Sequence, residues 1–92
     1  MKFPFSDSIN TAIITCSHIL CDGKPILYVS HDADDGMWQF LCGKHHTEID
    51  ARVVSLLEIY ELDNSIAQLA SMPCGWIAER KNVESNWIIG KR

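Results

Sequence analysis

Apolar residues gather in short runs along the chain, and polar turns separate these runs. Two β-rich runs, residues 26–31 and 37–42, flank the acidic segment 32–36, and this pattern predicts a β-hairpin. Gly36 can adopt a positive φ in the turn without steric cost, and neighbouring Asp side chains can accept hydrogen bonds from backbone N–H groups. The hairpin indicates a small sheet but does not indicate a function.

Further runs have the length and composition of strands, and they are residues 11–16, 51–54, 74–80 and 87–89. In the second arm of the hairpin, Trp38, Phe40 and Cys42 alternate onto one face. The residues between them are also largely apolar, which predicts a strand that is covered in part on both sides. We therefore expect Cys42 to be a packed thiol.

Two short helices are predicted between the strands. Ser55 and Glu58 have the spacing of a capping box, so a helix should begin there and run to about Leu62. Asp63 is a good N-cap for a second helix, which should end before Pro73.

These elements predict an α+β fold: a small, mostly antiparallel sheet of about five strands with one or two short helices packed on one face. We expect an N-terminal arm over residues 1–10 and a single α+β domain over residues 11–92. Ninety-two residues are enough for one modest hydrophobic core.

Charge and composition narrow the function classes. Twelve acidic residues against eight basic ones give a net charge of −4, which disfavours nucleic acid and anionic membranes as partners. No apolar run approaches the roughly 20 residues that cross a bilayer, and the N-terminus lacks the apolar core of a signal peptide. We therefore expect a cytoplasmic protein with free thiols.

Cysteine and histidine residues suggest one chemical alternative. Cys16, His18, Cys42 and His45 are thiol and imidazole groups of the kind that bind zinc, and Cys42 with a histidine could also form a nucleophilic pair. No two cysteines are separated by only two residues, and Cys74 has no partner near it in the sequence. We therefore expect no catalytic residue, no cofactor and no metal, with the Cys/His set as the alternative.

The acidic turn and one tryptophan are the candidate partner-binding residues: Asp32, Asp34, Asp35 and Trp87. The turn does not match a calcium-binding EF-hand loop, because Gly36 comes at the fifth position of the segment instead of the sixth. A solvated hairpin turn or a contact with a basic partner explains it better. Trp87 stands beside polar residues and should be the most exposed of the three tryptophans.

The order of segments resembles a bacterial family of predicted immunity proteins of polymorphic toxin systems, a family first catalogued as a domain of unknown function. The resemblance spans about residues 11–90 and is carried by Trp38–Gly43, 51–56, Glu58-Ile59, Leu62-Asp63, Pro73, Gly75, Ala78, Arg80 and Trp87. Where Gly and Pro often stand in that family, this chain has Leu57 and Asn64.

The resemblance implies a non-enzymatic cytosolic protein that binds and neutralises a toxin domain. Its partner would be a protein, and the acidic composition suits a basic toxin domain. The alternative is a housekeeping interaction or regulatory module without a toxin partner. An exposed edge strand at residues 87–89 could also support a homodimer.

Overall fold

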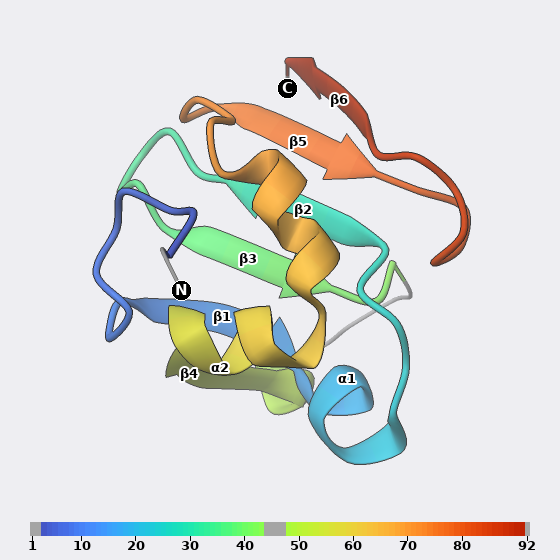
Figure 1. Ribbon diagram of the computed structural model, residues 1–92. Coiled ribbons are helices and arrows are strands. Elements are labelled where there is room, and N and C mark those ends of the chain that lie inside the picture. The colour runs from blue at the N-terminus through green and yellow to red at the C-terminus, as the bar shows by residue number, and fades with distance from the viewer. Residues whose placement is uncertain (1–2, 44–47, 92) are drawn as a thin grey trace.

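A computed structural model of the chain describes residues 3–43 and 48–91. Its centre is one mixed sheet of six strands in the order β4-β1-β3-β2-β5-β6 (Figure 1). The strands are β1 (Ala12–Cys16), β2 (Tyr28–His31), β3 (Trp38–Leu41), β4 (Ala51–Ser55), β5 (Trp76–Glu79) and β6 (Ile88–Lys91). The predicted α+β class is confirmed, with six strands where the sequence led us to expect about five.

All neighbouring strands run antiparallel except β1 and β3, which are parallel. The predicted hairpin is the β2–β3 pair, in which His31 faces Trp38 and Tyr28 faces Leu41. In the strand order, β3 lies between β2, its hairpin partner, and β1. The carboxyl ends of β1 and β3 consequently meet at one edge of the sheet.

Helices cover one face of this sheet, where α2 (Leu56–Leu62) and the 3₁₀ helix η2 (Asn64–Leu69) cross it (Figure 1). The predicted capping box is confirmed: Ser55 Oγ accepts from the Glu58 backbone N–H at 3.2 Å, and Glu58 Oε1 accepts from the Ser55 N–H at 3.5 Å. Asp63 caps η2 by accepting from the Ser65 N–H at 3.0 Å. Within the described residues no helix has the length and apolarity needed to cross a membrane.

Two short helical segments were not predicted, α1 (Ser17–Asp22) and the 3₁₀ helix η1 (Glu48–Asp50). The first turn of α1 receives no side-chain cap from Cys16, so the usual sequence signal for a helix start is missing. Gly23 ends the helix with a φ of 67°, and its N–H donates to the His18 carbonyl. Gly23 was therefore the one feature of this segment that could have indicated the end of a helix in the sequence.

The hydrophobic core lies between the sheet and the helical layer. Its fully buried large side chains are Trp38, Phe40, Ile13, Ile26, Leu56, Ile59, Ile66, Leu69 and Val29. Phe5, from the segment before β1, is also buried and meets the Trp38 ring edge-on at a centroid distance of 5.3 Å. The N-terminal segment therefore contributes a side chain to the core.

The other face of the sheet is more open. Trp38 and Phe40 are buried, but the alternate residues Gln39 and Leu41 are only half-buried. The strand register places Val53 of β4 and Ile88 of β6 on this second face, where they are 68% and 75% exposed. β3 is therefore covered fully on one side and in part on the other, which agrees with the partial cover that its sequence predicts.

Candidate functional site

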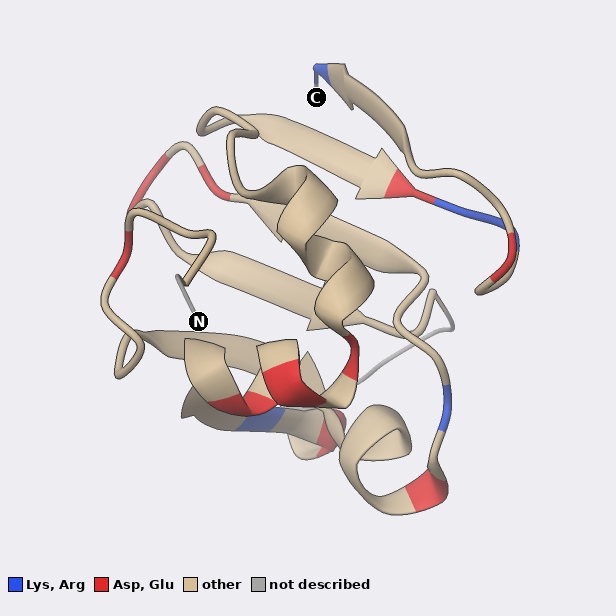
Figure 2. Cartoon of the chain, viewed as in Figure 1, with Lys and Arg blue, Asp and Glu red and all other residues tan. Residues whose placement is uncertain are grey.

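The turn between β2 and β3 has the geometry that its sequence predicts. The Asp32 N–H donates to the Met37 carbonyl at 2.8 Å, and the Gly36 N–H donates to the Asp32 carbonyl at 3.0 Å. Gly36 has a φ of 72°, a value that side chains other than glycine rarely adopt. Acidic residues mark this turn in Figure 2, and no basic residue interrupts them.

Asp32 serves the fold of the hairpin. Its Oδ2 accepts from Gln39 Nε2 at 2.7 Å, and its Oδ1 accepts from Ser30 Oγ at 3.2 Å. These bonds join the two arms of the hairpin through a half-buried carboxylate. Asp32 is therefore largely occupied by intramolecular contacts.

Asp34 and Asp35 are both exposed, but they differ in their contacts. Asp35 Oδ1 accepts from the Met37 backbone N–H at 2.9 Å and so shapes the turn. The Asp34 side chain makes no hydrogen bond or ion pair with any residue that the structure describes. Of the three acids, Asp34 has the charge that the fold does not use.

An open depression of about 700 Å³ borders the acidic turn. Its other side is formed by Cys74, Gly75 and Lys91. The three carboxylates of the turn outnumber the single lysine on this rim, so the depression favours a cationic group.

Trp87 lies away from this depression. The β5–β6 register pairs Trp76 with Lys91 and Glu79 with Ile88. Trp87 comes directly before Ile88, the first residue of β6, whereas Lys91 is the last residue of that strand. Its half-buried ring packs on Arg80, whose Cζ lies 4.2 Å from the ring centroid. The four predicted partner-binding residues therefore do not form one continuous surface.

Cys74 has a partner that sequence proximity did not reveal. Its Sγ lies 3.5 Å from His31 Nε2, and His31 Nδ1 lies 2.8 Å from the Met72 carbonyl oxygen. Because a carbonyl oxygen only accepts hydrogen bonds, Nδ1 donates to it, and in the neutral ring Nε2 is then left to accept from the thiol. The imidazole also stacks on Trp38 at a centroid distance of 3.9 Å.

No signal in the sequence would have paired Cys74 with His31, because they are 43 residues apart. The pairing follows from the neighbouring strands β2 and β5, in which His31 faces Trp76 and the Gly75 N–H donates to the His31 carbonyl. Cys74 is exposed, so its thiol is open to reagents.

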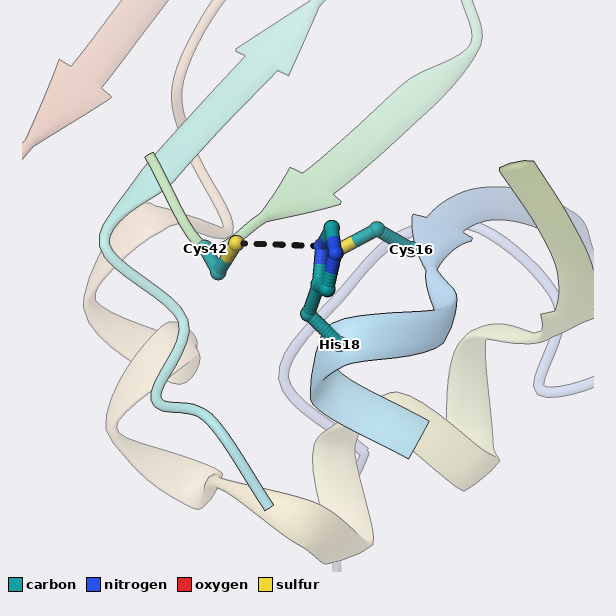
Figure 3. A group of neighbouring side chains, drawn as sticks. All are labelled: Cys16, His18 and Cys42. Atoms are coloured by element: carbon teal, nitrogen blue, oxygen red, sulfur yellow. Dashed lines mark hydrogen bonds between the residues drawn. The ribbon is translucent and has the colours of Figure 1, made fainter. Parts of the chain in front are cut away.

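The thiol and imidazole groups considered from the sequence converge in part (Figure 3). Cys16, His18 and Cys42 offer ligand atoms that all lie within 4.8 Å of one another, and Cys42 Sγ is 3.8 Å from His18 Nδ1. Both cysteines are buried, and burial raises the pKa of the Cys16 thiol above its ordinary value. His45, the fourth member of the predicted set, lies outside the described residues.

Comparison with known proteins adds no assignment. No family model, curated protein or solved structure matches this chain. The resemblance to predicted immunity proteins therefore stays a prediction.

Proposed function

We propose that this chain is a non-enzymatic cytoplasmic binding protein that attaches to the basic surface of a protein partner and covers it. The partner class suggested by the resemblance is a toxin domain, which the chain would neutralise by occlusion. Asp34 and the depression beside it form the centre of the proposed contact.

One observation carries this proposal. Asp34 is exposed at the tip of the hairpin, while Asp32 is held by Ser30 and Gln39. Since no fold contact uses the Asp34 charge among the described residues, that charge is free to pair with a cation of a partner.

Electrostatics supports a basic partner. The chain has a net charge of −4, and the depression at the turn has one lysine among its three carboxylates. Complementary charge speeds diffusional encounter and disfavours wrong partners, although it adds less to the final affinity. Fast capture is the property that a neutralising protein needs.

The proposal is tested by affinity capture from the native host, followed by reconstitution with the captured protein. Wild type should retain a partner that Asp34→Lys retains poorly. With the purified partner, the association rate constant should fall about 10-fold for this variant and should decrease with added salt for wild type.

Glu61→Lys is the matched control. Glu61 is exposed on α2, and its replacement by lysine changes the net charge by the same amount as Asp34→Lys does. Equal losses for the two variants would show that net charge alone matters and would remove the turn from the proposal. Neutralisation is a separate readout: a captured partner whose activity or toxicity is unchanged by the chain would favour an interaction module instead.

A further inference from the structure

Three potential metal ligands meet at one edge of the sheet. Cys16 is the last residue of β1, His18 lies in the first turn of α1, and Cys42 directly follows β3. β1 and β3 are parallel neighbours, with Thr15 opposite Phe40, so the residues that follow them come to the same edge. This topology places Cys16 and Cys42 side by side, and the start of α1 carries His18 toward them.

The distances among these atoms are close to those of a coordination sphere. Zinc holds sulfur at about 2.3 Å and nitrogen at about 2.0 Å, so tetrahedral ligand atoms lie roughly 3.3 to 3.8 Å apart. Cys42 Sγ and His18 Nδ1 are 3.8 Å apart, and all three ligand atoms lie within 4.8 Å of one another. An ion could therefore enter with side-chain movements of about 1 Å or less.

Backbone groups also contact the Cys16 sulfur. The N–H groups of Ile19 and Cys42 interact with it. In metal sites, hydrogen bonds from an outer shell orient the ligating groups, and these two N–H groups would have that role here.

Burial also defines how an ion would reach the site. Cys16 and Cys42 are only 1% and 2% exposed, whereas His18 is half-buried and opens the group toward solvent. Two thiols and one imidazole form a soft donor set that suits zinc and disfavours calcium or magnesium. The sequence argued against zinc because of spacing along the chain, but this spacing does not restrict ligands that adjacent strands bring together.

We propose that Cys16, His18 and Cys42 bind a zinc ion that joins β1, α1 and the end of β3. This role is independent of the acidic turn and therefore goes beyond the proposed binding function. The ion would act as a staple for a small domain, since metal binding to the folded state adds to its stability.

The test measures metal content in the untagged chain, purified under reducing conditions from cells that are supplied with zinc. Wild type should contain about one equivalent of zinc, and exchange with cobalt should give thiolate-to-cobalt charge-transfer absorption. His18→Ala and Cys42→Ser should each retain less than about 0.2 equivalents. His18→Ala changes a half-buried side chain, so it separates loss of metal from loss of fold, which circular dichroism checks.

Cys21→Ser is the matched control, because Cys21 is an exposed cysteine of α1 outside the triad. It should keep the zinc content of wild type, and zinc should raise the midpoint of thermal unfolding of both proteins but not of His18→Ala. Zinc below about 0.2 equivalents in wild type, or equal loss in the Cys21 variant, would overturn the site. A Cys16–Cys42 disulfide in the freshly purified chain would also overturn it.

Discussion

Arg80 and Asp63 form a hydrogen-bonded ion pair, with 2.6 Å between Arg80 Nη2 and Asp63 Oδ2. The Arg80 side chain is 2% exposed, and its other donors are also used: Nε donates to the Ile26 carbonyl at 2.9 Å and Nη1 to Ser65 Oγ at 3.0 Å. One guanidinium thus connects the end of β5, the segment before β2 and the start of η2. The buried charge is tolerated here because each of the three guanidinium nitrogens donates a hydrogen bond and one of them bonds a carboxylate.

Replacing Arg80 should destabilise the fold strongly. Arg80→Met should lower the free energy of unfolding by about 3 kcal/mol, because it removes the cation that pairs with Asp63 Oδ2 and the N–H that donates to the Ile26 carbonyl. Urea unfolding followed by tryptophan fluorescence measures this change. Lys81→Met is the control, since Lys81 is exposed and should change stability by less than about 0.5 kcal/mol. Equal effects of the two variants would contradict the structural role of the ion pair.

The same pair predicts how stability depends on pH. Burial acts to raise the pKa of Asp63, but hydrogen bonds from Ser65 and Arg80 outweigh it and hold the pKa below the ordinary value of 3.8. Between the lowered pKa of the folded state and the ordinary pKa of the unfolded state, the unfolded chain binds more protons than the folded one. The free energy of unfolding therefore rises with pH in that range. The contribution of Asp63 to stability is complete at pH values above its ordinary pKa. It is lost as the pH falls through the lowered pKa of the folded state.

Asp63→Asn tests this sign. The variant should be less stable than wild type near neutral pH, and the difference in free energy of unfolding should shrink as the solution is acidified from about pH 6 to about pH 2.5. Urea unfolding at several pH values gives the curve. A difference that widens with acid would show that the pKa of Asp63 is raised instead.

Trp87 should contribute to stability through its contact with Arg80. The guanidinium lies 4.2 Å from the ring centroid, while the Trp87 Nε1 is buried without a hydrogen-bond partner in the described structure. Trp87→Phe keeps an aromatic face and removes the unpaired N–H, so we expect a loss below about 1 kcal/mol. Trp87→Leu removes the aromatic face and should lose about 1 to 2 kcal/mol. A larger loss for Phe than for Leu in thermal unfolding would contradict this role.

Local pairs of residues were predictable from the sequence. Ser55 and Glu58 are three residues apart, and the Gly36 turn depends on the conformation of one glycine, so both features follow from neighbouring positions. These features fixed the hairpin and the helix start, and with the alternation of apolar residues they predicted the fold class.

The candidate sites depend on strand order, which local patterns do not specify. The sequence identified Cys16 and Cys42 as candidate ligands. The fold expected from it, a mostly antiparallel sheet, did not indicate that β1 and β3 are parallel neighbours. His31 and Cys74 meet because β2 pairs with β5, across 43 residues of sequence. To predict such contacts, one must know which distant strands pair and in what register. The alternation of residues along a single strand does not give this information.

The acidic turn should respond differently to the loss of each carboxylate. Asp32→Ala removes acceptors for Ser30 and Gln39 and should reduce the free energy of unfolding by about 1 to 2 kcal/mol. Asp34→Ala removes an exposed charge without a described contact and should change it by less than about 0.5 kcal/mol. Chemical denaturation of both variants gives the comparison. If Asp34→Ala were the more damaging, its charge would serve the fold and would not be free for a partner.

Cys74 should owe part of its reactivity to His31. Its thiol is exposed and lies 3.5 Å from the imidazole Nε2, which can accept the thiol proton, so iodoacetamide should modify Cys74 quickly while buried Cys42 stays protected. His31→Phe keeps a ring against Trp38 but removes the acceptor, and it should slow modification of Cys74 several-fold. Peptide mass spectrometry follows each cysteine separately, with exposed Cys21 as the internal control. Since Cys21 makes no contact with His31 in the described residues, a parallel decrease at both cysteines would show a general structural change and contradict the imidazole effect.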